Sequence, residues 1–170
     1  LAAFLSRRPL IIHEQNAVAG TTNRLLSPIA DRVLCGLPGP FAKTRMAEVV
    51  GNPVRDILRR VDRQDLESLN SFSAARPMRI LVLGGSLGSA PLNELLPATA
   101  AVLTSKGYGD TISVWHQCGQ RNQSTAELAW RQQSLGNLRL DAYIHDMVAA
   151  YCWADVVISR AGALTVSELA

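Results

Sequence analysis

Short continuous apolar runs alternate with segments of helical spacing along the second half of the chain. Such runs, typical of strands buried on both faces of a sheet, occur at residues 78–85, 111–119, 138–143 and 155–159. Segments of helical spacing lie between and after them, at 90–107, 123–136, 146–154 and 164–170. Strands separated by helices of this length predict βαβ units and a parallel sheet.

The first part of the chain has the same alternation with shorter elements. Strands are predicted at 9–14, 32–36 and 48–51, and a helix at 21–30. Residues 56–77 differ from both flanks, because they are polar, rich in charge and closed by Pro77. We therefore predict a first domain part over 1–55, a helix or linker over 56–77, and a second domain part over 78–170.

Composition indicates a globular chain with an uneven charge. Of its 170 residues, 48% are hydrophobic and 18% charged, and no apolar run approaches the roughly 20 residues that cross a bilayer. Residues 1–76 carry eleven Lys and Arg against seven Asp and Glu, whereas residues 77–170 carry six against seven. The basic first part suits phosphates or an anionic membrane surface, but it lacks the dense basic and aromatic stripe of a nucleic-acid binder.

Two further features concern cellular context and chain ends. Cys35, Cys118 and Cys152 include no C-x-x-C pair, which predicts reduced and mostly buried thiols rather than metal ligands or disulfides. The sequence begins at Leu1 without Met, and its last helical pattern reaches Ala170 without a C-cap. Together these ends predict an internal fragment of a longer protein.

The loops after the predicted strands hold the candidate chemistry, because ligands of parallel α/β sheets bind beyond the strand C-termini. The loop "LGGSLGS" (83–89) follows a strand and opens a helix, so its glycines, the Ser86 hydroxyl and free helix N–H groups suit a phosphate. It matches neither G-x-G-x-x-G nor a Walker A loop. A phosphate site and a plain tight turn both stay open.

Two other loops offer polar groups. "VVGNPVR" (49–55) places Arg55 after a turn, where it is either a bidentate diphosphate ligand or a solvated side chain. "IIHEQN" (11–16) places His13 and Glu14 at a strand end. Acid–base or metal chemistry is one interpretation, but a hydrogen-bonded structural pair is favoured because no second ligand cluster accompanies them. Asn16, at the tip, is better placed to contact a polar ligand.

The final stretch, "SRAGALTVSELA" (159–170), has two interpretations. Thr165 and Glu168 have the T-x-x-E spacing of a capping box, which would explain Glu168 structurally. Alternatively, Glu168 accepts hydrogen bonds from two sugar hydroxyls near the start of the helix, with Ala163 and Leu164 keeping the approach narrow. Spacing alone does not choose between them.

Taken together, the loops resemble one family. The stretches "HEQNAVAGTTNR", "VVGNPVR", "LVLGGSLGS", "ISVWHQCG" and "DMVAAYCWADVVISRAGALTVSELA" are similar in order and spacing to the MurG family of bacterial N-acetylglucosaminyltransferases. The resemblance implies an α/β glycosyltransferase B fold, with two Rossmann-like domains and parallel sheets, here truncated at both ends. Residues 1–55 would then be the C-terminal part of the acceptor domain, and 78–170 the N-terminal half of the UDP-GlcNAc-binding domain.

The resemblance also implies an activity. The family moves N-acetylglucosamine from UDP-GlcNAc to the muramoyl 4-hydroxyl of undecaprenyl-diphospho-MurNAc-pentapeptide, converting lipid I to lipid II with inversion, in peptidoglycan synthesis for cell wall, cell shape and cell division. It needs no cofactor and no bound catalytic metal. By motif match, Glu168 binds the ribose, Ile144 the uracil, and Ser86 and Arg55 the diphosphate. The remaining donor-site residues are Asn16, on the transferred sugar, and Ala163, Leu164 and Thr165, on the sugar–phosphate.

The acceptor implies a peripheral position on the cytoplasmic face of the bacterial inner membrane. Phe4 and Leu5 beside Arg7 and Arg8, with Arg24 on the following helix, suit interfacial docking; packing of the two apolar side chains onto the sheet is the alternative.

The chain departs from the family pattern in one loop and lacks two of its parts. Leu87 stands where many members have Gln, and the candidate general base lies upstream of residue 1, so no catalytic residue is assigned. The later Gln pair that grips the donor sugar is also absent, and the fragment alone is expected to be inactive. Other interpretations are a different UDP-sugar enzyme of the same fold, such as a glycolipid synthase or UDP-GlcNAc 2-epimerase, and a non-catalytic nucleotide-sugar-binding protein.

Overall fold

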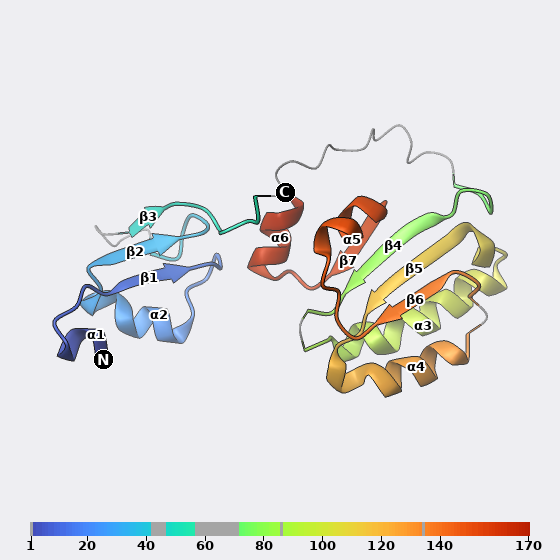
Figure 1. The fold of residues 1–170 in the computed structure, drawn as a ribbon, viewed down its shortest axis with the longest axis horizontal. Helices are drawn as coiled ribbons and strands as arrows, with labels where there is room; N and C mark the ends of the chain where they lie inside the picture. Colours follow the sequence, from blue (N-terminus) through green and yellow to red (C-terminus); the bar gives the residue numbers. More distant parts are fainter. Residues whose placement is uncertain (1, 42–46, 57–71, 86, 134) are drawn as a thin grey trace. The chain divides into compact units, whose positions relative to one another are not determined.

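The computed structural model describes residues 2–41, 47–56, 72–85, 87–133 and 135–170 (Figure 1). The chain divides into two compact units. The first comprises Leu1–Arg59 with Ala161–Ala170, and the second comprises Arg60–Arg160. Most of the predicted linker, residues 57–71, lies outside the described residues, and the predicted domain limits stay a prediction. None of the helices in the described ranges is long and apolar enough to cross a membrane.

The first unit contains a three-stranded parallel sheet in the order β1-β2-β3. Its strands are β1 (Ile11–Glu14), β2 (Arg32–Cys35) and β3 (Ala47–Val49). Its helices are α1 (Ala2–Leu5), α2 (Thr21–Leu26), the 3-10 turn η1 (Ser27–Ile29) and α6 (Ala163–Leu169). The inward-facing strand residues Ile12, Val33 and Cys35 form a small core together with Ala30 and Phe41 from the loops.

The helix predicted over 21–30 is shorter than expected. It ends at Leu26 and continues as the 3-10 turn η1, which contains Pro28. Proline lacks a backbone N–H and restricts the preceding residue, so the α-helical hydrogen-bond ladder stops there. The loop between β1 and α2 follows the C-terminal end of β1.

The second unit contains a four-stranded parallel sheet in the order β6-β5-β4-β7. Its strands are β4 (Met78–Leu83), β5 (Ile112–Gln117), β6 (Leu138–Asp141) and β7 (Val156–Ser159). Its helices are α3 (Ala90–Ser105), α4 (Gln123–Arg131) and α5 (Met147–Trp153), with 3-10 turns η4 (Gly109–Thr111) and η5 (Gln120–Asn122). The predicted βαβ pattern and parallel sheet are confirmed. The helix predicted over 123–136 ends early, at Arg131.

Helices cover both faces of this second sheet, with α3 and α4 on one side and α5 on the other (Figure 1). Successive strand residues alternate between the two faces. Leu81 and Trp115, paired across β4 and β5, pack with α5, whereas Val82 and Val114 pack with α3 and α4. This burial on both faces accounts for the continuous apolar runs in the sequence.

Two of the three cysteines are buried, as predicted. Cys35 and Cys118 are buried free thiols and Cys152 is an exposed one. Burial raises the pKa of the Cys35 and Cys118 thiols above the ordinary range, which keeps both neutral at physiological pH.

Candidate functional site

The loop after β1 is organised around the carboxylate of Glu14, which is 3% exposed. One carboxylate oxygen accepts hydrogen bonds from the Asn16 backbone N–H at 3.0 Å and from the Asn16 side-chain amide at 3.1 Å. The other accepts from the Gly20 N–H and from the Asn23 side-chain amide, both at 2.9 Å. Four donors thus hold the 14–23 turn, which runs from the end of β1 through its loop to the first residues of α2, and Asn16 is exposed in it.

These hydrogen bonds determine the charge state of Glu14. Burial alone would raise the pKa of its carboxyl, but the bonds from Asn16, Gly20 and Asn23 outweigh burial and lower the pKa to about 2. The neighbouring His13 is held through its Nε2 atom, 3.1 Å from the Gly51 carbonyl. The favoured interpretation of His13 and Glu14 as hydrogen-bonded structural residues agrees with this geometry. No group of three or more metal-ligating side chains occurs within the described ranges.

Arg55 and Glu168, both predicted donor-site residues, lie together in the first unit. The Arg55 Nε atom is 3.3 Å from the Glu168 Oε1 atom. The Glu168 side chain is only 11% exposed, whereas that of Arg55 is 52% exposed. The guanidinium can bind a phosphate, and the carboxylate can accept hydrogen bonds from hydroxyl groups. The two binding groups therefore lie at one place on the protein.

A second contact in the first unit joins the same two segments. The Asn52 side-chain amide donates to the Gln15 carbonyl at 3.1 Å and to the Ser167 hydroxyl at 3.0 Å. The Ser167 hydroxyl in turn donates to the Ala163 carbonyl at 2.8 Å. Sequence reasoning missed the roles of Asn52 and Ser167, because nothing in the local pattern signals a hydrogen bond between residues so far apart in the chain.

The capping-box interpretation of Thr165 and Glu168 is wrong. Helix α6 begins at Ala163, its N-cap is Gly162, and no side chain caps it. Thr165 is therefore the third helical residue and cannot accept the N-cap hydrogen bond. Glu168 is therefore not the N3 partner of a capping box, and its partly buried carboxylate lies beside Arg55. At the start of the same helix, Leu164 is 41% exposed.

The other predicted site residues belong to the second unit. Ile144, predicted at the uracil, is 4% exposed and packs with Leu81, Leu83 and Trp115. Ser86 lies outside the described residues. Its loop does follow β4, and Gly85 and Gly88 adopt positive φ angles of 81° and 78°, a conformation that favours glycine.

The fold and the strand-end loops define an α/β protein of the doubly wound, ligand-binding class. The family model that matches is the glycosyltransferase family 28 C-terminal domain, over residues 79–170. Because the match covers more than half of the chain, the chain belongs to this family.

Similar proteins agree with the family. The chain is 48% identical to UDP-N-acetylglucosamine--N-acetylmuramyl-(pentapeptide) pyrophosphoryl-undecaprenol N-acetylglucosamine transferase of Nitrosococcus oceani, over 99% of this chain and 45% of that protein. It is 51% identical to the Cellvibrio japonicus protein of the same name, over 99% of this chain and 46% of the relative. Among solved structures it is similar to Acinetobacter baumannii MurG, with TM-score 0.67 and 35% identity over 99% of this chain and 44% of that one.

These findings confirm the MurG resemblance and the predicted α/β glycosyltransferase B fold with parallel sheets. The chain spans less than half the length of the curated relatives that it matches.

Proposed function

We propose that this chain belongs to an inverting N-acetylglucosaminyltransferase that moves GlcNAc from UDP-GlcNAc to the muramoyl 4-hydroxyl of lipid I, giving lipid II. The observation that carries the proposal is identity of 48% and 51% to two proteins named as this transferase, over nearly the whole chain. The confirmed family and fold support it, since both are those of glycosyltransferases.

The donor-site roles rest on the family match, residue by residue. Glu168 accepts hydrogen bonds from the ribose hydroxyls, and Arg55 binds the diphosphate. The 3.3 Å distance between the Arg55 Nε and Glu168 Oε1 atoms supports this assignment, because it places the two groups close enough to contact one ligand. Ile144 holds the uracil. The other assigned residues are Asn16, Ser86, Ala163, Leu164 and Thr165.

The main task of these residues in the reaction is to stabilise the negative charge that develops on the leaving UDP. The 4-hydroxyl oxygen of the acceptor attacks the anomeric carbon, the bond from that carbon to the UDP oxygen breaks, and the hydroxyl proton passes to a base. Negative charge grows on the departing UDP, so a fixed guanidinium stabilises the transition state more than the ground state. Arg55 is proposed to supply that charge.

The acceptor is a polyprenyl lipid, which places the enzyme at the cytoplasmic face of the inner membrane as a peripheral protein. A surface hollow in the first unit is lined by Leu5, Arg7, Arg8, Pro9, Leu10, Ile29 and Asp31. Leu5 is 75% exposed there. An exposed apolar side chain that shares this hollow with Arg7 and Arg8 supports docking on anionic lipid.

An acceptor-dependent assay on the full-length protein tests the proposal. With UDP-GlcNAc and a short-chain lipid I analogue, we expect one UDP released for each GlcNAc transferred, and a β-1,4 linkage by the proton coupling constant of the product. Conversion of UDP-GlcNAc without acceptor would indicate a 2-epimerase instead. Tight UDP binding without turnover would indicate a non-catalytic binding protein.

A further inference from the structure

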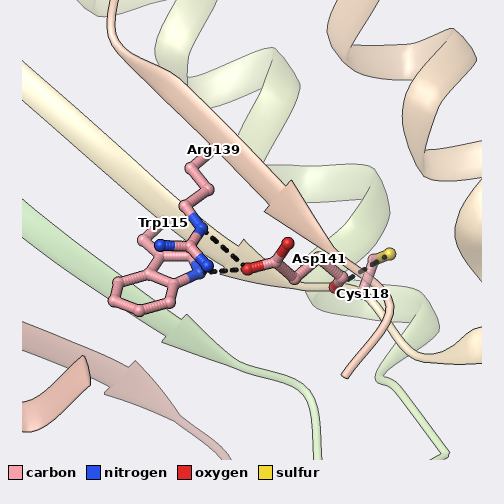
Figure 2. Close-up of polar contacts among 4 residues, drawn as sticks. All are labelled: Trp115, Cys118, Arg139 and Asp141. Carbon is pink, nitrogen blue, oxygen red and sulfur yellow. Dashed lines mark hydrogen bonds and ion pairs between the residues drawn. The ribbon is translucent and has the colours of Figure 1, made fainter. Parts of the chain in front are cut away.

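The turn at residues 117–119 begins at the last residue of β5 and is hydrogen-bonded to the end of β6 and the loop that follows it. The Cys118 N–H donates to the Asp141 carbonyl at 3.0 Å, and the Gly119 N–H donates to the Ala142 carbonyl at 3.1 Å. The Cys118 thiol lies 3.5 Å from the same Asp141 carbonyl (Figure 2). The loop after β6, which continues to Ile144, is therefore fixed at the last strand residue, Asp141, and at its own first residue, Ala142.

The same turn is bonded on its other side to the glycine-rich loop, residues 84–89. The Gly84 N–H donates to the Gln117 carbonyl at 3.2 Å, and the Gln117 side-chain amide donates to the Gly85 carbonyl at 3.1 Å. Gln117 is only 4% exposed. From η5, just before α4, the Asn122 side-chain amide donates to the Leu87 carbonyl at 3.2 Å.

Close packing joins the turn and the glycine-rich loop as well. A Cβ atom at Gly88 would overlap the Cys118 carbonyl oxygen, and one at Gly119 would lie 2.5 Å from the Gly88 Cα atom. Gly119 also has a positive φ of 84°. The buried Asn93 side chain donates to the Cys118 carbonyl at 3.0 Å and closes the contact from α3. Only glycines allow the two backbones to approach this closely.

Side-chain contacts of Asp141 also fix the C-terminal end of β6. The Asp141 carboxylate accepts from the Trp115 indole N–H at 2.7 Å and from the Arg139 Nε at 2.8 Å. The Arg139 guanidinium also lies over the Trp115 ring, 3.9 Å from its centre (Figure 2). Asp141 therefore has both its side chain and its carbonyl engaged, which fixes the direction in which the loop leaves the sheet.

We propose that the 117–119 turn is a positioning element for a bound nucleoside diphosphate. It fixes the distance between the loop that carries Ile144 and the glycine-rich loop. Both loops then have their binding conformation before the base and the phosphates arrive. Gln117 acts on the phosphate side, and Trp115, through Asp141, acts on the base side. The inference rests on the proposed function, because it takes those two loops to bind uracil and diphosphate.

The energetic reason lies in the freedom of the glycines. Without the Gln117 bond, the Gly84–Gly85 backbone has many accessible conformations, and a ligand would have to order it on binding. A loop that is ordered before binding avoids this entropic cost. The gain in affinity applies only to the part of the ligand that this loop contacts, which is the diphosphate for the glycine-rich loop. Substitutions on the two sides of the turn are therefore expected to change the affinities for UDP and uridine differently.

Calorimetry of the full-length protein with UDP and with uridine tests the proposal. Gln117→Met keeps the side-chain length and removes the donor. We expect UDP to bind about three- to tenfold more weakly, the effect of one lost neutral hydrogen bond, with uridine affinity unchanged within about twofold. Trp115→Phe removes the indole N–H and is expected to weaken UDP and uridine by the same factor.

Gln123→Met is the matched control, because Gln123 is exposed and its amide donates to Glu127 on the same helix. It should leave both affinities unchanged. If Gln117→Met does not fold, Asn122→Ala removes the bond to Leu87 from a more exposed position and carries the same expectation.

Each outcome is decisive. Equal weakening of UDP and uridine by Gln117→Met, or no weakening of either, overturns the positioning role, because a general loss of structure does not separate the two ligands. If the unaltered protein binds neither ligand, the proposed function fails and this inference fails with it. The unaltered protein thus distinguishes the two failures.

Discussion

Glu14 shows how a single buried carboxylate can define a loop. Its four hydrogen bonds come from residues within nine positions of it, so one side chain orders the whole 14–23 turn. The sequence indicated a structural Glu from the absence of partner ligands, but not which donors it would bind. Those donors depend on the backbone path, which the residue pattern does not specify.

Glu14→Gln should destabilise this turn in a pH-dependent way. The folded pKa of about 2 lies below the ordinary 4.5, so the carboxylate contributes stability that is complete above about pH 4.5 and is lost as the pH falls towards 2. The shift corresponds to at most about 3 kcal/mol. Hydrogen exchange of the Asn16 and Gly20 amides measures it. A variant as protected as the unaltered protein at pH 7 would contradict the account.

Arg55→Ala tests the diphosphate role. Because uridine has no phosphate, we expect UDP affinity to fall roughly tenfold or more and uridine affinity to stay within about twofold. Calorimetry with both ligands measures this. Arg131→Ala is the control, since it removes an exposed ion pair with Glu127 in the second unit. Equal losses of UDP and uridine would assign Arg55 a structural role only.

At the scale of elements, the docking of α4 on β5 depends on a buried polar contact. The Trp130 indole N–H donates to the His116 Nδ1 atom at 3.0 Å, and the two rings meet edge to face. His116 is fully buried, and burial lowers its pKa to about 4. The imidazole must therefore stay neutral for the helix to remain docked.

This contact predicts acid sensitivity of the second unit. The unfolded state binds a proton near pH 6.5 and the folded state only near pH 4, so stability should decline as the pH falls through that window, by up to about 3 kcal/mol. Urea unfolding followed by tryptophan fluorescence reports on this unit, because all three tryptophans lie in it. His116→Asn keeps an acceptor near Nδ1 and cannot titrate. A decline as steep in this variant would assign the pH dependence to other groups.

The sequence predicted the order and type of these elements better than their ends or long-range contacts. Continuous apolar runs identified the strands, since both faces of the second sheet are covered. The helix ends were missed at Leu26 and Arg131, and the T-x-x-E spacing suggested a cap that Gly162 occupies instead. The Asn52–Ser167 bond was beyond prediction, because a pattern reports local periodicity rather than tertiary contact.

At the scale of the whole molecule, the donor-site residues were found by resemblance rather than by physics. Spacing left Glu168 open between a cap and a ligand, and Arg55 open between a phosphate ligand and a solvated side chain. In the structure, Gly162 rather than Thr165 is the N-cap of α6, and Arg55 lies beside Glu168. The ligand roles themselves need measurement.

The proposed membrane docking concerns the full-length protein and has a direct test. Full-length protein with Arg7→Ser and Arg8→Ser should bind anionic vesicles more weakly at low salt, at about 1 kcal/mol for each arginine near the surface. Co-sedimentation with vesicles measures the loss. The matched control changes Arg121 and Arg131, two arginines of the second unit, to Ser. Undiminished binding by the Arg7 and Arg8 variant would place the docking surface elsewhere.

The central claim is that the Glu168 carboxylate of α6 binds the donor of a GlcNAc transfer reaction, and the KM for UDP-GlcNAc of full-length Glu168→Ala tests it most directly. A lost hydrogen bond to a charged group predicts weaker donor binding by about 1.5–3 kcal/mol, seen as a KM raised at least about tenfold. Melting measured in parallel separates this effect from stability. An unchanged KM together with a lower melting temperature would remove Glu168 from the donor site and contradict the account.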